Sequence, residues 1–426
     1  MLPLVRRPLP PLRRALAATV VLASASWGLT ACSHPPSTLR LGAVFPLHGP
    51  QAPSATEEWR GVKVAADLVN QDGGVGGRRI SLDVRDLETR EGATKAVSSL
   101  HDDGVPVVLG AYSSQLSIPA ATAASDSRLV YWEAGAVADR VTGQGSPWVF
   151  RVGATGSNLG ANSARFAATQ LVPRLGLAPS NTRVAVVWEN DAYGQSVADA
   201  AVATAQASGL QVVSRTTYDA YKPDWTSVMA QVAGARPDIL VLASYIPDGE
   251  AFRRAMLAQH VRVGAMIGSS MAECMSNFGD DLGPQAVGVF ASDRPGGGFN
   301  PGALSPTGGR DYERFAAAWK AQTGGATPDE EALAGFSAGW ALFHDVLPRA
   351  RTFSPSDIAA AARQTVLAEG ELPNGAGLHF ASDRSHEGQN LLAAAVIWQW
   401  QAVGHSVVVW PPTYATGAPA MVPLPA

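Results

Sequence analysis

The 426-residue sequence contains only two cysteines, Cys32 and Cys274, and charged residues make up only 16% of it. Two cysteines cannot build a disulfide framework, so the sequence excludes a small disulfide-stapled fold. Basic and acidic residues nearly balance, with 32 Lys and Arg against 36 Asp and Glu. This balance offers no basic footprint, and we expect no nucleic-acid partner. Apolar residues make up 46%, which excludes a wholly disordered chain and allows a large buried core.

Long hydrophobic runs are also scarce. Residues 15–29 form an uncharged, mostly apolar run that follows four arginines, Arg6, Arg7, Arg13 and Arg14. The run is shorter than the roughly 20 residues that a membrane span needs, so it fits the apolar region of an export signal. The run ends in Leu29-Thr30-Ala31-Cys32, which resembles a lipobox. We therefore expect a lipoprotein signal peptide over 1–31, a lipid on Cys32 and a short tether over 32–38. The alternative is an ordinary cleaved signal with an incidental cysteine.

Catalytic and cofactor motifs are missing or weak. Gly335-Phe336-Ser337-Ala338-Gly339 matches the G-x-S-x-G string of serine hydrolases, but it lies inside a predicted helix, whereas that motif needs a strand, a sharp turn and a helix. The run Gly73–Gly77 lacks the Lys-Ser or Lys-Thr of a phosphate loop and predicts a turn. His379 and His386 lie near acidic residues without a metal-binding spacing. We expect no metal, no cofactor and no enzyme, and a hydrolase using Ser337 stays the alternative from another class.

Strand and helix patterns alternate along the chain. Short apolar runs predict strands, and the segments between them have helical apolar spacing; the predicted strands are 39–44, 80–84, 105–109, 129–132, 183–188, 210–215, 239–243 and 265–268. Continuous apolar strands alternating with helices indicate parallel sheets covered on both faces. The pattern breaks near 153–157, which predicts an α/β fold of two Rossmann-like lobes. Residues 287–410 carry too few strands for a third sheet, so we expect them to complete both lobes.

Polar and aromatic residues follow the predicted strands where a ligand is expected. Ligands of parallel α/β sheets bind beyond the carboxyl ends of the strands. The residues found there are Tyr112, Ser113 and Ser114, then Glu133, Ala134, Gly135 and Ala136, then Tyr193, Tyr245 and Ser270. Hydroxyls and aromatic rings at one sheet edge predict a pocket for a small polar molecule.

At these residues the chain resembles the branched-chain amino-acid type of periplasmic binding protein, the type I solute-binding proteins of ABC importers. The resemblance rests on Leu41–Gly49 (LGAVFPLHG), Asn70–Arg78 (NQDGGVGGR), the Tyr193-Gly194 turn and Val408–Pro412 (VVWPP). It extends from Leu39 to about Pro412.

The resemblance implies two lobes joined by three crossovers that close on a ligand like a hinge. With crossovers near Gly153, Ser292 and Ser382, lobe 1 comprises 39–155 and 292–382, lobe 2 comprises 156–291 and 383–415, and 416–426 form a tail. The implied partners are a small-molecule ligand, a membrane permease and, through the lipid, the membrane itself. A sensor for an amide or urea with the same fold is the nearest alternative.

The family's ligand residues transfer onto this sequence as follows. Ser114, with Ser113 beside it, corresponds to the hydroxyl that holds the ligand carboxylate, and 134–137 to a segment that binds through its backbone. Tyr193 and Tyr245 correspond to the aromatic residues of lobe 2. The family's ammonium-binding glutamate falls near Ser270, so that carboxylate is missing. Glu133 could replace it, although a structural role is an equal alternative; Glu273 is a poorer candidate.

Overall fold

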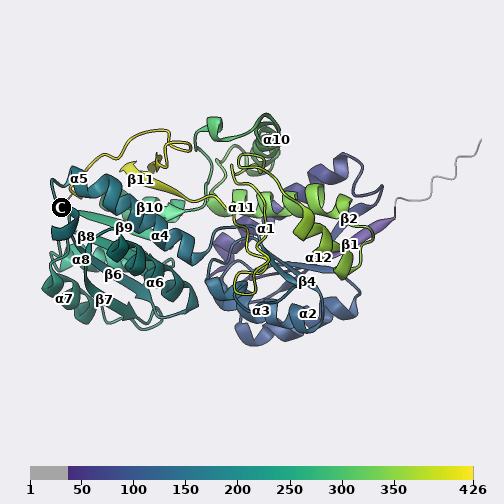
Figure 1. Cartoon of the computed structure of the whole chain (residues 1–426), viewed down its shortest axis with the longest axis horizontal. Helices are drawn as coiled ribbons and strands as arrows, with labels where there is room; N and C mark the ends of the chain where they lie inside the picture. The colour runs from purple at the N-terminus through teal and green to yellow at the C-terminus, as the bar shows by residue number, and fades with distance from the viewer. Residues whose placement is uncertain (1–36, 426) are drawn as a thin grey trace, which may run out of the picture. The chain divides into compact units, whose positions relative to one another are not determined.

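The computed structural model describes residues 37–425, and these fold around two separate sheets (Figure 1). The first sheet has five parallel strands in the order β2-β1-β3-β4-β5. Its strands are β1 (Thr38–Phe45), β2 (Arg79–Asp86), β3 (Val107–Gly110), β4 (Val130–Glu133) and β5 (Val149–Arg151). Lobe 1 is defined here as this sheet with the helices packed on it.

The second sheet has seven strands in the order β12-β11-β10-β9-β8-β6-β7. Its strands are β6 (Arg183–Glu189), β7 (Gln211–Tyr218), β8 (Ile239–Ser244), β9 (Ala265–Met271), β10 (Phe290–Asp293), β11 (Val396–Ala402) and β12 (His405–Trp410). Strands β6 to β10 are parallel to one another, and the hairpin β11–β12 adds an antiparallel edge. Lobe 2 is this sheet with its helices. The prediction of an α/β fold with two parallel-rich lobes is confirmed.

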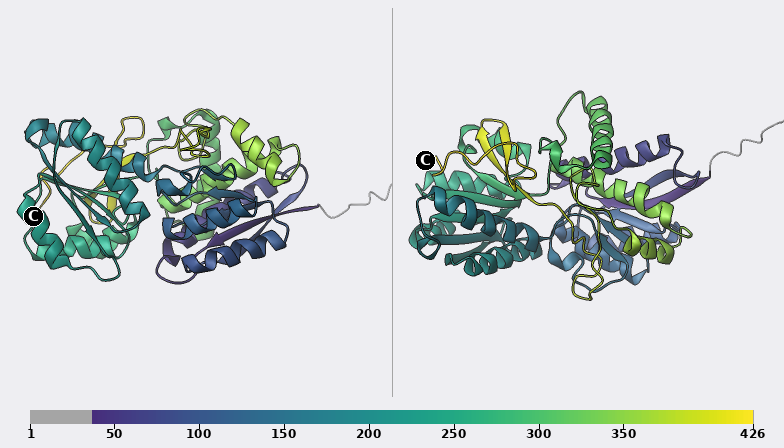
Figure 2. Two further views of the ribbon diagram at one scale, coloured as in Figure 1. Left: turned by 60° about the horizontal axis from the view of Figure 1, so that its bottom comes forward. Right: turned by 45° about the horizontal axis from the view of Figure 1, so that its top comes forward.

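Helices cover both faces of each sheet (Figure 2). Those packed in lobe 1 are α1 (Ala52–Gln71), α2 (Ala93–Asp102), α3 (Ser114–Asp126), α10 (Pro306–Thr323), α11 (Glu330–Trp340) and α12 (Pro355–Gln364). Those of lobe 2 are α4 (Gly156–Phe166), α5 (Val172–Arg174), α6 (Ala192–Ala207), α7 (Trp225–Ala235), α8 (Asp248–Ala258) and α9 (Ser276–Leu282). Helix α11 lies directly against α1, although they are far apart in the sequence (Figure 1). Residues 306–364 thus return to lobe 1 and β11–β12 to lobe 2, which is why the late segment carries so few strands.

Two elements near the expected break at 153–157 escaped the sequence pattern. Strand β5 has only three residues, too few to show a period, and the apolar residues of α4 are diluted by the small and polar side chains of its sequence GSNLGANSARF. A local signal for α4 does exist. The Thr155 side chain accepts from the Asn158 N–H while the Asn158 side chain accepts from the Thr155 N–H, a reciprocal cap that marks the start of the helix.

The chain crosses between the sheets three times: between β5 and α4, after β10, and before β11. Before the last crossing, Gln389 pairs with Arg151 through a backbone bridge, and Asn390 Nδ2 donates to the Val152 carbonyl at 2.9 Å. Residues up to Asn390 therefore remain beside β5 of lobe 1. We propose that the third crossover follows Asn390 rather than lying near Ser382; the predicted domain boundaries otherwise stay a prediction.

Candidate functional site

The loop after β3 brings two serines to the start of α3. Ser113 is the residue before the helix, is fully buried, and its Oγ has no hydrogen-bond partner. Ser114 Oγ accepts from the Ala138 N–H at 3.0 Å, so this hydroxyl supports the loop after β4. A buried hydroxyl without a partner is costly to maintain unless something else bonds it. Of the two predicted serines, Ser114 has a hydroxyl that bonds within the protein, whereas the Ser113 hydroxyl has no partner among the described residues.

Glu133 ends β4 and folds back onto its own loop. Its Oε1 accepts from the N–H groups of Gly135 and Ala136 at 3.0 and 2.9 Å, and its Oε2 accepts from the Tyr131 hydroxyl at 3.2 Å. Burial raises the pKa of Glu133 to about 7. The structure therefore supports the structural alternative for Glu133 rather than its role as an ammonium receptor. It also occupies two of the backbone N–H groups of the 134–137 segment.

Tyr193 and Tyr245 lie together in lobe 2, with ring centroids 4.9 Å apart and an interplanar angle of 59°. The buried Tyr193 hydroxyl points at the carbonyls of Ser244, Ser269 and Ser270, 3.0–3.2 Å away, and so ties the end of β8 to the end of β9. The Tyr245 hydroxyl donates to Asp191 Oδ2 at 3.2 Å. Both tyrosines lie at strand ends of lobe 2, and both hydroxyls bond within the protein.

Asp191 was missed by sequence reasoning and connects the two lobes. Its Oδ1 accepts from the Gly194 N–H at 2.7 Å and caps α6. Burial raises its pKa, while hydrogen bonds that include one from the side chain of Gln115, on α3 of lobe 1, act in the opposite direction. The pattern Asp191-x-x-Gly194 before a helix is an N-cap signal that could have identified this residue.

Ser270 lies at the end of β9, and Glu273 lies in the turn that follows it. Ser270 has a positive φ of 77°, and its buried Oγ has no hydrogen-bond partner. Glu273 is buried, accepts from Ser244 Oγ at 3.2 Å, and has a pKa raised to about 8 by burial. A Cβ on Gly268 would lie 2.3 Å from its carboxyl group, so a larger residue there would force the Glu273 side chain to move. Glu273 is therefore packed inside lobe 2.

A buried cluster around Arg294, next to these loops, had no sequence signal of its own. Arg294 Nη1 donates to the carbonyls of Ala134 and Gly135 at 3.0 and 2.6 Å, its Nε pairs with Glu330, and its Nη2 lies 3.4 Å from Glu331. The Glu58 side chain lies against Gly135. Both of its carboxyl oxygens are buried and have no hydrogen-bond partner among residues 37–425. Burial is the largest cause that raises the pKa values of Glu58, Glu330 and Glu331 well above the usual range.

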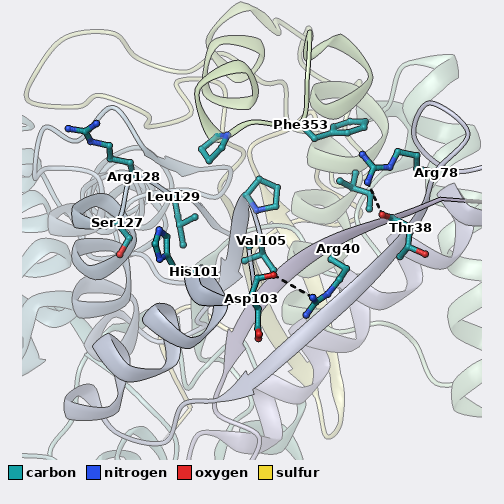
Figure 3. Close-up of a pocket in the computed structure, with 14 residues that line it drawn as sticks. Thr38, Arg40, Arg78, His101, Asp103, Val105, Ser127, Arg128, Leu129 and Phe353 are labelled. Carbon is teal, nitrogen blue, oxygen red and sulfur yellow. Dashed lines mark hydrogen bonds between the residues drawn. The ribbon is translucent and has the colours of Figure 1, made fainter.

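Cavities in the part of the chain that the structure describes lie on both sides of the sheets. One cavity, of about 1490 Å³, is lined from both lobes, by the start of α1, by 274–277, by the loop before α11 and by the β11–β12 hairpin. A second, of about 420 Å³, lies between α3 of lobe 1 and the ends of β6 and β7 of lobe 2. A third, of about 510 Å³, lies at the opposite, amino ends of the lobe 1 strands, with Thr38, Val105 and Leu129 in its wall (Figure 3). Only the first two adjoin the strand ends that carry the predicted site.

The G-x-S-x-G string does not form a hydrolase site. Ser337 lies in the middle of α11 and is fully buried, and a Cβ on Gly335 would lie 2.0 Å from the Glu58 carbonyl. The small residues of the string thus allow α11 to approach α1 closely. The strand-turn-helix geometry that exposes a nucleophilic serine is absent at this position, which contradicts the alternative of a hydrolase using Ser337.

The model of a family described as periplasmic binding proteins matches residues 38–416. The chain belongs to this family. It is 28% identical over 375 residues to the Leu/Ile/Val-binding protein homolog 8 of Brucella abortus, covering 88% of this chain and 90% of that protein. It is 24% identical over 379 residues to homolog 7 of Brucella melitensis, covering 88% and 91%. The predicted resemblance is confirmed.

Solved periplasmic binding proteins share the fold. The ABC transporter substrate-binding protein of Desulfitobacterium hafniense in complex with Leu superposes with a TM-score of 0.69 at 21% identity, over 88% of this chain and 100% of that one. A solute-binding protein of R. palustris in complex with benzoate has a TM-score of 0.69 at 19% identity, over 90% and 98%. Within residues 37–425, no helix is both long and apolar enough to cross a bilayer. Cys32 and the signal segment lie outside the described residues.

Proposed function

We propose that this periplasmic binding protein is a lipid-anchored solute receptor of an ABC importer on the extracytoplasmic face of the membrane. It would bind an amino acid or a similar small polar molecule between the lobes. The observation that supports this most strongly is the pair of buried, unpartnered hydroxyls of Ser113 and Ser270. Ser113 lies in the loop between β3 and α3 of lobe 1, and Ser270 lies at the end of β9 of lobe 2. A ligand that bonds both hydroxyls would therefore hold the lobes closed.

The ligand chemistry follows from the groups that remain available. Ser113 directly precedes α3, where backbone N–H groups and the helix dipole favour a negative charge. A carboxylate is common to the leucine and the benzoate held by the two structural relatives, and it is the group we assign to this end of the pocket. This chain's equivalents of the ligand residues are Ser113, Ser114, the 134–136 loop, Tyr193, Tyr245 and Ser270.

An amino-acid ligand carries an ammonium group, whereas the amide or urea ligand of the alternative does not, so the protein's partner for that group distinguishes the two. Glu133 bonds its own loop and Glu273 bonds Ser244, so neither carboxylate is held ready for an ammonium group. That observation favours a ligand without an ammonium group, such as a simple carboxylate or the amide or urea of a sensor with the same fold. An amino acid would have to displace one of these internal contacts.

A binding screen with a scattering measurement tests the proposal. Thermal unfolding is followed with L-leucine, L-isoleucine, benzoate, acetamide and urea, since a ligand that binds only the folded state raises the melting temperature. Small-angle scattering with the stabilising compound should then show a smaller radius of gyration. Stabilisation by leucine supports the amino-acid receptor, and stabilisation by acetamide or urea alone supports the sensor. Stabilisation by none of the five would contradict the proposed ligand classes, and no compaction at saturation would contradict the proposed closure.

A further inference from the structure

A thiol and two carboxylates meet where the two lobes join. Cys274 follows β9 of lobe 2, Asp293 ends β10, and Glu330 begins α11 of lobe 1. One potential ligand atom from each lies within 4.8 Å of the other two. Cys274 Sγ donates to Asp293 Oδ2 at 3.1 Å. The three residues come from separate parts of the sequence, which is why no spacing motif revealed them.

Arg294 already contacts one oxygen of each of the two carboxyl groups. Its Nε lies 3.5 Å from Asp293 Oδ1 and pairs with Glu330 Oε1. Glu330 is only 1% exposed, and its other oxygen, Oε2, is buried without a hydrogen-bond partner. A buried carboxylate oxygen of this kind is expected to have a donor or a cation. Glu330 Oε2 is therefore the independent sign of a missing partner.

The local charge also favours a cation. Glu58, Asp293, Glu330 and Glu331 surround the single guanidinium of Arg294, and all five side chains are buried. Four buried carboxyl groups share one guanidinium, so acidic groups are in excess of basic ones in this cluster. A divalent cation would compensate the excess without removing Arg294 from its partners.

We propose that Cys274, Asp293 and Glu330 form a binding site for a divalent cation of the zinc class. Thiolate and carboxylate ligands together suit zinc and cobalt, whereas magnesium and calcium prefer oxygen alone. Binding replaces the Cys274 S–H proton, which leaves to solvent, by a metal–sulfur bond. A tetrahedral zinc ion with bonds of about 2.1–2.3 Å needs ligand atoms about 3.4–3.6 Å apart, so small side-chain adjustments suffice.

A metal ion could reach this site through a cavity, and its binding would affect how the two lobes are held together. Cys274 and Glu330 line the cavity of about 1490 Å³, so an ion can reach them and its fourth position can take water or a ligand oxygen. Because Cys274 belongs to lobe 2 and Glu330 to lobe 1, the ion would bridge the lobes and stabilise their closed arrangement by its binding free energy.

Cobalt titration tests the site directly. The full chain carries Cys32→Ser, so that Cys274 is its only thiol, and Co²⁺ is added under anaerobic conditions. A saturable near-ultraviolet thiolate-to-cobalt band should appear at one equivalent. Glu330→Gln should weaken binding at least tenfold, while Glu57→Gln, which changes a carboxylate in the same cavity but outside the trio, should leave it unchanged.

The possible outcomes distinguish metal bound at this site from metal bound elsewhere, and one measurement does not depend on the folding of a further variant. Saturable binding without a thiolate band would place the metal elsewhere, for instance at the exposed group His48, Asp86 and Glu88, and would overturn the proposal. No saturable binding would overturn it too. X-ray absorption of the zinc-loaded chain needs no further variant: one sulfur at about 2.3 Å supports the site, and an all-oxygen or nitrogen shell refutes it.

Discussion

Arg294 and Gly135 are 159 residues apart in the sequence, yet Arg294 Nη1 donates to the Gly135 carbonyl at 2.6 Å. Gly135 lies in the loop after β4 of lobe 1, and Arg294 directly follows β10 of lobe 2. The same guanidinium pairs with Glu330 and Glu331 at the start of α11. One side chain thus fixes the second crossover against both a candidate ligand loop and the acidic end of a lobe 1 helix.

Replacing this arginine should destabilise the fold severely. Arg294→Met leaves buried carboxylates and two carbonyls without their donor, and breaking a buried pair in this way costs about 3–5 kcal/mol. The free energy of unfolding, measured in urea, should fall by about that amount. Arg310→Met is the control, because Arg310 is exposed and, among residues 37–425, its side chain donates only to Thr307 Oγ1, so its change should stay within about 0.5 kcal/mol. Equal stability of the two variants would contradict the role assigned to Arg294.

The stability of the protein should depend on pH through Glu189. Burial, with Asp191, Asp248 and Asp219 nearby, raises its pKa from 4.5 to about 9. A carboxyl group with a raised folded-state pKa binds its proton more tightly when folded, so the free energy of unfolding falls as pH rises from about 4.5 to about 9. Glu189→Gln should remove part of that fall and be more stable than wild type at pH 9.

The control for this pH profile is the exposed Glu91. Glu91→Gln should leave the profile of wild type unchanged when thermal unfolding is recorded from pH 5 to pH 9. Parallel profiles for wild type and Glu189→Gln would show that Glu189 does not carry the raised pKa.

The hydroxyl of Tyr245 should stabilise the ligand-free protein. It donates to Asp191, the N-cap of α6, and a hydrogen bond to a charged group contributes about 1.5–3 kcal/mol. Tyr245→Phe should therefore lower the unfolding free energy by roughly that amount. Tyr221→Phe serves as the control, because Tyr221 is 83% exposed. A Tyr245→Phe protein as stable as this control would show that the bond to Asp191 contributes nothing.

Lipid attachment should depend on Cys32 alone. Cys32→Ala should move the protein from the membrane fraction to the soluble one and abolish incorporation of labelled fatty acid, because stable anchoring requires the acyl chains. Cys274→Ala, which changes the only other cysteine, should keep the label. Label on Cys32→Ala, or none on wild type, is the result that would refute the lipobox.

Much of the fold was predictable because it depends on local patterns. Apolar runs such as 239–243 and 183–188 recover β8 and β6 nearly to the residue, since a strand buried on both faces shows no polar interruption. Strand β5 failed because three residues carry no period. The edge of the sheets that carries the candidate site followed from the rule that parallel strands present their carboxyl ends together.

The individual contacts at that edge were not predictable. Whether Glu133 faces a ligand or its own loop depends on where the N–H groups of Gly135 and Ala136 point, and composition does not encode this. The partners of Arg294 come from segments some 36 and 160 residues away, so no spacing could reveal the cluster. Likewise, only the structure distinguishes the unpartnered hydroxyl of Ser113 from the bonded one of Ser114.

The most direct test of the proposed ligand site compares two buried serines. Ser113 and Ser337 are both fully buried with unpartnered hydroxyls, but only Ser113 lies at a strand end, and Ser337 lies inside α11. Calorimetric titration uses benzoate and the twenty amino acids on wild type, Ser113→Ala and Ser337→Ala. We predict that the compound bound by wild type binds Ser113→Ala about tenfold or more weakly, the loss expected for one hydrogen bond to a charged group, and binds Ser337→Ala unchanged. Equal affinity for wild type and Ser113→Ala, or no binding of any of these compounds to wild type, would contradict the account.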